Sequence, residues 1–293
     1  MRLHSPINWL GSKERIAGKL LGYIPPHRYY LEAYGGAAAL LFAKPPSEFE
    51  VYNDIDGELV NFFRVLRDKE KFQRFYEKVC LTPYSREEYN YCRGVLYETE
   101  DPVERAYRFY VVARQSFGGD FAHSWGFNVK TIRRGMPCVV SKWLSGIEML
   151  PEIHKRVMTV LIENLPALEC MEKYGSAWEY NESFIVVDPP YLPSTRKSGK
   201  YRFDMSEQEH VELIDYLIRN QKRNRFMVLG FDNDLYERLV ENGWQKICWE
   251  RICLAIARAR SKKLQGKGAL QDEKYRRKEC IWINYELPSG IDL

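Results

Sequence analysis

The sequence predicts an α/β fold in which a sheet is interrupted by a largely helical insertion. Three observations support this prediction. Residues 184–187 form a short, continuous apolar run, which is typical of a buried parallel strand. Residues 29–54 have the order strand, glycine turn, helix, strand and acid, which is half of a Rossmann-like unit. The intervening segment, from about residue 78 to 154, has an irregular helical pattern rich in Tyr and Arg.

The first part of the chain supplies the opening strands and helices. We expect a strand over 29–34, a helix over 37–42 after Gly35-Gly36, and a second strand over 50–53 that ends at Asp54. A further helix is expected from Asp56 to Arg67, because its apolar residues are spaced for one helical face.

The last part of the chain returns to strands. Residues 157–162, 184–187 and 226–229 are predicted strands, and Ser206 to Asn220 is a predicted helix. Ser206 at the N-cap with Glu209 three residues on forms a capping box. Two late strands, over 245–254 and 279–285, are expected to pair as an antiparallel hairpin.

Composition and charge place bounds on the class of protein. The 293 residues are 45% hydrophobic and 29% charged, which is ordinary for a soluble globular chain. The net charge is only +4, but basic residues cluster after residue 195 and again over 258–278, which favours a polyanion nearby. Seven scattered cysteines without a C-x-x-C pair predict reduced thiols and no zinc site. Reduced thiols lead us to expect a cytoplasmic protein. No apolar stretch approaches the roughly 20 residues of a membrane span.

The most informative motif is Asp188-Pro189-Pro190-Tyr191, directly after the apolar run. Two successive prolines end the strand and hold the next loop rigid. They therefore present a carboxylate and an aromatic face at the carboxyl edge of a sheet, where open α/β sheets place ligands. This combination suits a flat, amino-bearing group such as a nucleobase. Taken alone, the tetrapeptide would be interpreted as an ordinary Asp-Pro turn.

Three further features fit a cofactor site. Gly35-Gly36 permits close approach of the backbone to a ligand, although it is equally a helix entry. Asp54 stands where acids accept hydrogen bonds from ribose hydroxyls, although it could instead cap the next helix. Trp9 and Lys13 offer an aromatic plate and an ammonium group, or simply a buried Trp and a surface Lys. Neither a P-loop nor a full G-x-G-x-x-G is present, so a cofactor with a ribose but no pyrophosphate, S-adenosylmethionine, fits best.

The chain also resembles a known family through W-x-G-S-K at 9–13, L-E-A-Y-G-G-A-A at 31–38, N-D-I-D-G-E-L-V-N at 53–61 and D-P-P-Y at 188–191. These motifs are similar to those of the Dam-like adenine-specific DNA methyltransferases, in the version common in phage and prophage enzymes. Their order is that of the alpha group. Further similarity lies at residues 114–119, 162–169, 195–196 and 279–282. Ala33 replaces the usual Pro, and Asp56 stands where many relatives carry Asn.

The resemblance implies a Rossmann-like S-adenosylmethionine-dependent methyltransferase sheet with a largely helical inserted target-recognition domain. It implies a catalytic domain in two parts, 1–77 and 155–293, and a target-recognition insertion over 78–154. The residues implied to bind the cofactor are Trp9, Lys13, Glu32, Gly35, Gly36, Asp54 and Asp188. Those implied to act on a flipped adenine are Asp188, Pro189, Pro190 and Tyr191. Candidate DNA contacts are Arg114, Lys130, Arg133, Arg134, Arg196 and Lys197, and no metal ligand is expected.

The implied activity is site-specific transfer of a methyl group from S-adenosylmethionine to the exocyclic amine of adenine in double-stranded DNA. Two alternatives remain open on the sequence. One is a methyltransferase acting on another planar amine, such as that of cytosine, of an RNA adenine or of a protein glutamine. The other is a catalytically silent DNA-binding relative. We expect a monomer or weak dimer in a bacterial or phage-infected cell, with a cognate restriction nuclease as an optional partner.

Overall fold

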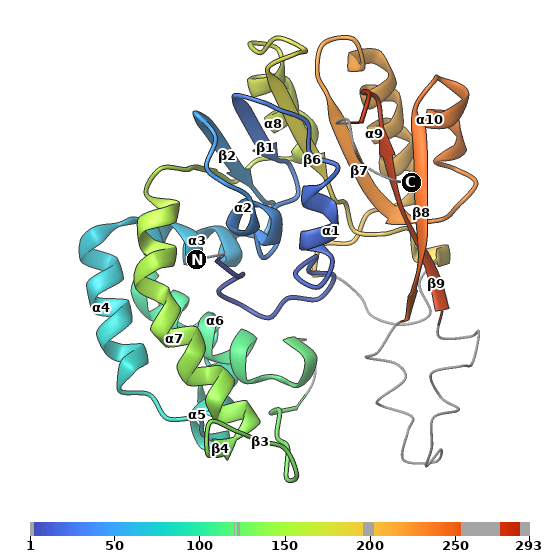
Figure 1. Cartoon of the computed structure of the whole chain (residues 1–293). Helices are drawn as coiled ribbons and strands as arrows, with labels where there is room; N and C mark the ends of the chain where they lie inside the picture. The colour runs from blue at the N-terminus through green and yellow to red at the C-terminus, as the bar shows by residue number, and fades with distance from the viewer. Residues whose placement is uncertain (1–2, 120, 122–123, 196–201, 253–275, 288–293) are drawn as a thin grey trace. The chain divides into compact units, whose positions relative to one another are not determined.

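The computed structural model describes residues 3–119, 121, 124–195, 202–252 and 276–287. The chain divides into two compact units, and Figure 1 labels their helices and strands. Unit 1 comprises Met1–Ile24 and Tyr34–Cys170, and unit 2 comprises Pro25–Ala33 and Met171–Leu293. Each unit is described by itself below.

The open-sheet part of unit 1 contains two parallel strands and three helices. Strand β2 (Phe49–Asn53) pairs with β5 (Leu161–Glu163), with Val51 opposite Leu161. Helices α1 (Ala17–Leu21), α2 (Ala39–Ala43) and α3 (Gly57–Arg67) accompany them. Asp56 caps α3 by accepting hydrogen bonds from the N–H groups of Glu58 and Leu59, which fixes where that helix begins.

The rest of unit 1 is mainly helical. It contains α4 (Lys69–Cys80), α5 (Arg86–Gly94), α6 (Pro102–Gln115), the 3-10 turn η1 (Phe117–Gly119) and α7 (Cys138–Val157). A short hairpin, β3 (Ile132–Arg133) with β4 (Met136–Pro137), precedes α7. Rings of α6 pack on α3: Tyr110 stacks on Phe62 with centroids 5.8 Å apart. These helices therefore share one core with the sheet part of unit 1, and the role of residues 78–154 as a separate recognition domain stays a prediction.

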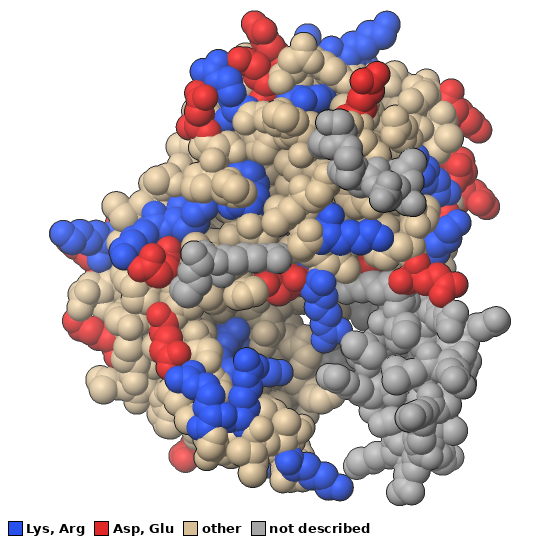
Figure 2. Space-filling model, in the orientation of Figure 1, with Lys and Arg blue, Asp and Glu red and all other residues tan. Residues whose placement is uncertain are grey.

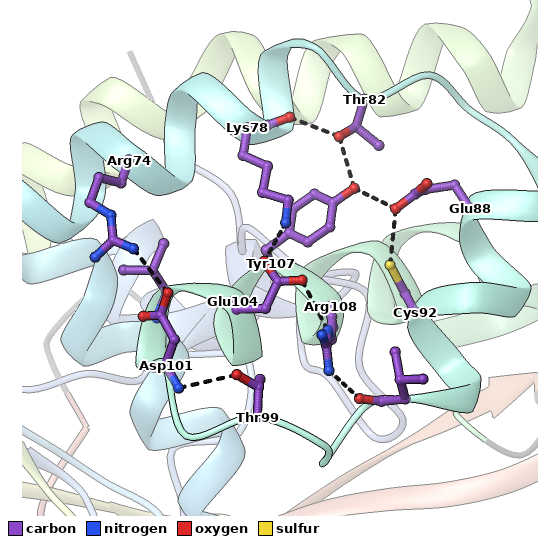
Figure 3. A network of polar contacts seen from close by, with 12 residues as sticks. Arg74, Lys78, Thr82, Glu88, Cys92, Thr99, Asp101, Glu104, Tyr107 and Arg108 are labelled. Carbon is purple, nitrogen blue, oxygen red and sulfur yellow. Dashed lines mark hydrogen bonds and ion pairs between the residues drawn. The ribbon is translucent and has the colours of Figure 1, made fainter.

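A polar network joins α4, α5 and α6 (Figure 3). The Tyr107 hydroxyl donates to Glu88 at 2.7 Å and lies 3.0 Å from the Thr82 hydroxyl. Glu88 also accepts from the Cys92 thiol, and burial is the largest cause of the raised pKa of that thiol. Cys92 is therefore a protonated structural thiol rather than a nucleophile.

A buried charge cluster anchors the start of β2. Glu50, at 1% side-chain exposure, pairs with Lys44 and with Arg156 of α7. Burial alone would raise the pKa of Glu50, but hydrogen bonds and charge from Arg156 and Lys44 outweigh it and lower that pKa. One carboxylate thus pairs with two buried cations and ties α7 to β2.

Unit 2 is built on a sheet of order β1-β6-β7-β9-β8. Strands β1 (Tyr29–Glu32), β6 (Ser183–Val187) and β7 (Phe226–Phe231) are parallel. Strands β9 (Arg276–Ile283) and β8 (Gln245–Ile252) add antiparallel partners. All five residues of β6 are buried, as its apolar sequence predicts. The helices are α9 (Glu207–Asn220), α10 (Glu237–Glu241), the 3-10 turn η2 (Pro193–Thr195) and α8 (Ala167–Gly175), which contains the boundary between the units.

The predicted α/β class is confirmed, together with the capping box at Ser206 and the late antiparallel hairpin. One predicted strand was too long: α7 continues to Val157, so the strand expected over 157–162 begins only at Leu161. The prediction of reduced thiols was wrong for Cys248 and Cys280, which form a disulfide. The pairing of β8 with β9 places these two residues directly opposite each other, with Cα atoms 4.1 Å apart. Within the described ranges, no helix has the length and apolarity to cross a membrane.

Candidate active site

In unit 2, two acids lie at the carboxyl ends of neighbouring parallel strands. Glu32 ends β1 in register with Val186 of β6, and Asp188 follows β6 directly. Glu32 is 4% exposed and accepts a 2.7 Å hydrogen bond from the Tyr30 hydroxyl. Asp188 is half-buried, with its Oδ1 atom inside the protein. The edge where both strands end therefore carries two fixed acceptors, as expected for the ligand-binding edge of a parallel sheet.

Tyr191 is held firmly in the loop that follows Asp188. Its ring is 6% exposed and packs edge-on against Phe231, at the end of β7, with centroids 4.7 Å apart. Its hydroxyl donates to the Glu279 carboxylate on β9 at 3.1 Å. Pro189 is buried beside it, and Pro190 is half-buried. The Asp-Pro-Pro-Tyr loop is thus a rigid, packed element.

In unit 1, the glycine turn is shaped by its neighbours. A Cβ on Gly35 would lie 2.2 Å from the Tyr52 ring, so only glycine fits there. Gly36 has φ +50°, a left-handed conformation that glycine adopts readily, and its N–H donates to Asp54 Oδ2 at 2.8 Å. The Tyr52 hydroxyl donates to the Gly36 carbonyl at 2.7 Å. The turn is therefore pinned by the end of β2.

Asp54 is a half-buried carboxylate with an unusual proton affinity. Burial is the main cause that raises its pKa to about 6, against the lowering effect of hydrogen bonds from the N–H groups of Asp56 and Gly36. The alternative in which Asp54 caps α3 is wrong, because Asp56 holds that position. Asp54 is left as an acceptor beside the glycine turn.

Trp9 and Lys13 lie in the same unit as the turn. Atom Cδ1 of Trp9 is 3.4 Å from where a Gly36 Cβ would be, so the indole covers the turn. The indole also packs against Phe109 and Phe121, with centroids 5.9 and 5.7 Å away. Lys13 is 6% exposed, and its Nζ donates to the Gly11 carbonyl at 2.9 Å. Lys13 is therefore a buried ammonium rather than a surface one.

The predicted DNA-contacting residues differ in their surroundings. Arg134 forms a two-pronged pair with Glu148, with N–O distances of 3.2 and 3.0 Å, and Arg114 donates to the Lys142 carbonyl. Lys130 and Arg133 are exposed. Figure 2 shows Lys and Arg side chains on the part of unit 1 that carries α5, β3 and β4. Arg196 and Lys197 lie outside the described residues.

Sequence reasoning missed three side chains that shape the site: Tyr52, Phe231 and Glu279. Tyr52 offers no motif, and its role follows only from its contacts with Gly35 and Gly36 in the folded chain. Glu279 lies in a stretch that resembles the family, so its acid could have been noted, but its contact with Tyr191 depends on the position of β9.

Comparison with known proteins adds an independent finding. Residues 9–119 match the family described as D12 class N6 adenine-specific DNA methyltransferase. The chain is 26% identical over 253 residues to the type II methyltransferase M.CviBI of Paramecium bursaria Chlorella virus NC1A, covering 82% of this chain and 89% of that protein. It is 22% identical over 275 residues to the type II methyltransferase M.MjaIII of Methanocaldococcus jannaschii, covering 80% and 87%. A third relative, M1.LlaDCHI of Lactococcus lactis subsp. cremoris, is 26% identical over 238 residues, covering 76% and 78%.

Proposed function

From the premise that this chain belongs to the D12 class of N6 adenine-specific DNA methyltransferases, we propose that it methylates adenine at specific sites in duplex DNA, with S-adenosylmethionine as methyl donor. The observation that carries the proposal is the packed Asp188–Tyr191 loop at the carboxyl end of β6, the strand that pairs with β1, where Glu32 is the last residue. A fixed acceptor beside a fixed ring is what a flat amine requires.

The residues of unit 1 fit the cofactor. A ribose presents two adjacent hydroxyl donors, and Asp54 is a carboxylate acceptor set between the glycine turn and α3. Gly36 has no side chain, so the Trp9 indole lies close to the turn, and the indole is a surface on which a purine can stack. We assign Trp9, Lys13, Glu32, Gly35, Gly36, Asp54 and Asp188 to cofactor binding. When bound, S-adenosylmethionine supplies a methyl group activated by a sulfonium.

The unit 2 residues would activate the amine. An adenine must leave the duplex to reach such a loop, at a cost of about a few kcal/mol. Stacking on Tyr191 can return about 1–3 kcal/mol. If Asp188 and the Pro189 carbonyl accept hydrogen bonds from the two N–H groups of the amine, the nitrogen becomes pyramidal. Its lone pair is then no longer conjugated with the ring. No covalent enzyme intermediate is needed.

The proposal extends to partners and location. Duplex DNA is the substrate, the protein acts in the cytoplasm as a monomer or weak dimer, and a cognate restriction nuclease is an optional companion. Residues 78–154 are proposed to read the sequence. Methylation of cytosine or of RNA adenine is the rival in this class, because each offers a similar planar amine. A silent DNA-binding relative is the rival outside it.

The test is expression in a host that lacks DNA methylation, followed by long-read sequencing that maps modified bases. The proposal expects methylated adenines within one short motif. A genome without modified adenine, from cells that contain folded protein, would contradict it. Asp188→Ala is the matched control, since it should remove the modification without removing the protein.

A further inference from the structure

The hydrogen bond between Tyr191 and Glu279 has a role beyond packing. Glu279 is a carboxylic acid with 0% exposure in the middle of a sheet. Acids are seldom fully buried, because burial removes their hydration unless a hydrogen-bond donor replaces it. The Tyr191 hydroxyl, 3.1 Å from Glu279 Oε1, is such a donor.

The sheet itself places Glu279 in line with the contacts of Tyr191. Glu279 of β9 pairs with Phe231 of β7 on one side and with Trp249 of β8 on the other. Residues directly opposite in an antiparallel sheet project to the same face, so Phe231 and Glu279 are neighbours on one surface. The Tyr191 ring contacts Phe231 at 4.7 Å between centroids and reaches Glu279 with its hydroxyl. The ring is thus held at two points.

The ring turns about the axis from Cβ to the hydroxyl. The hydrogen bond to Glu279 fixes the direction of this axis, and the contact with Phe231 limits rotation about it. An aromatic ring that is held before its substrate arrives pays less of the ordering cost of binding. We infer that Glu279 is a positioning residue: it fixes the orientation in which Tyr191 receives the target base. This inference rests on the proposed function, because it concerns the base that Tyr191 stacks upon.

The inference predicts that the Tyr191 hydroxyl matters even though only the ring would touch the base. Tyr191→Phe keeps the ring and removes one fixed point. Glu279→Met removes the same hydrogen bond by replacing its acceptor with a side chain of similar volume. Glu279→Gln keeps a carbonyl oxygen as acceptor for the Tyr191 hydroxyl, so this variant should retain most of the wild-type rate.

The experiment is a double-mutant cycle on the full chain, read by the single-turnover rate of methyl transfer to duplex DNA. A second readout is the fluorescence of 2-aminopurine at the target position, which reports the stacking of the flipped base. We expect Tyr191→Phe and Glu279→Met each to slow transfer roughly threefold to tenfold, the value of one hydrogen bond. Their combination should be less than about twofold slower than either single change. Glu279→Gln should stay within about threefold of the wild type.

A matched control separates positioning from stability. Tyr236→Phe removes another buried tyrosine hydroxyl of unit 2, which lies 2.8 Å from His210 Nδ1. It should lower the melting temperature and leave rate and fluorescence unchanged.

Several results would overturn the inference. One is a double variant whose rate loss equals the product of the two single losses. Another is a wild-type rate for Tyr191→Phe, and this test remains valid even if the Glu279 variants fail to fold. A third is a Glu279→Met variant that changes only the melting temperature. If the wild type itself transfers no methyl group, the proposed function fails first.

Discussion

The three carboxylates assigned to the site are held in different ways, and their partners decide what each can do. Glu32 is already bonded to the Tyr30 hydroxyl, which fixes its position. Asp54 accepts two backbone N–H groups and still has a raised pKa, because burial dominates. Asp188 follows a fully buried strand and precedes two prolines, so its backbone cannot relax away from a substrate.

The role of Asp188 as an acceptor is tested by two substitutions. Asp188→Ala should abolish methyl transfer, because no acceptor remains. Asp188→Asn should leave a measurable rate, because an amide oxygen can accept one hydrogen from the amine. Single-turnover rates on both variants decide this, and equal losses would contradict the acceptor role.

Asp54 predicts a pH dependence of cofactor affinity. A ribose hydroxyl donates best to the charged carboxylate. The affinity for S-adenosylmethionine should therefore be highest above a pH of about 6 and should fall as the pH decreases below this value. The stability of the ligand-free protein should change in the opposite direction. The raised pKa of Asp54 increases the free energy of unfolding at low pH, and this contribution is lost as the pH rises through about 6.

Calorimetric titration with S-adenosylmethionine between about pH 5 and 7.5 measures this effect, bounded by about tenfold per pH unit for a single group. The Asp54→Asn variant should bind S-adenosylmethionine more weakly than the wild type, and its affinity should not depend on pH in this range. A wild-type affinity that stays constant across this range would contradict the assignment.

Tyr191 shows where residue-level prediction stops. The sequence predicts a rigid loop that presents an aromatic face at the edge of the sheet. The ring, however, is only 6% exposed, since Phe231 and Glu279 enclose it. Those contacts come from strands distant in sequence, so no local pattern could reveal them.

At the scale of elements, the β3–β4 hairpin gives two adjacent arginines different surroundings: Arg133 lies on β3 and Arg134 lies in the turn. Arg134 has φ +54° and Gly135 φ +72°, the conformation of a tight two-residue turn. The pair of Arg134 with Glu148 ties the turn to α7. Arg133 is exposed on β3. Arg134 is therefore suited to hold the hairpin, and Arg133 to contact DNA.

Substitutions of the two arginines should have different consequences. Arg133→Ala should relax the methylated motif at one position if it reads a base, worth about 1–3 kcal/mol, or weaken all sites alike if it holds a phosphate. Arg134→Ala should resemble Glu148→Gln, since both break one pair. Motif mapping of the three variants checks this. An Arg134→Ala variant with altered sequence choice, beside an unaltered Glu148→Gln, would reverse the assignment.

The charge cluster at the start of β2 predicts an asymmetry in stability. Glu50→Gln leaves two buried cations without their anion and should cost about 3–5 kcal/mol of unfolding free energy. Arg156→Met leaves the pair of Lys44 with Glu50 and should cost less. Urea denaturation measures both. A larger loss for Arg156→Met would show that Glu50 is not the centre of the cluster.

The elements were predicted well wherever a local signal was strong. The apolar run of β6, the capping box of α9 and the hairpin of β8 with β9 follow directly from residue patterns. The start of β5 was misplaced because α7 overrides the local preference near Val157. The disulfide was missed because Cys248 and Cys280 are brought together only by strand register.

At the scale of the whole molecule, the residues assigned to the proposed function occur in both units. Unit 1 carries the glycine turn and Asp54, and unit 2 carries Glu32 and the Asp188–Tyr191 loop. The order of motifs could be predicted from sequence alone, whereas the packing of Tyr52 and Glu279 required the fold.

The central claim is that the chain transfers a methyl group to adenine in duplex DNA. The most direct measurement incubates purified protein with S-adenosylmethionine and unmethylated duplex DNA, digests the DNA to nucleosides and analyses them by mass spectrometry. We expect 6-methyladenine with the wild type, none with Asp188→Ala, and no methylcytosine with either. Methylcytosine as the sole product, or transfer to RNA but not to duplex DNA, would contradict it.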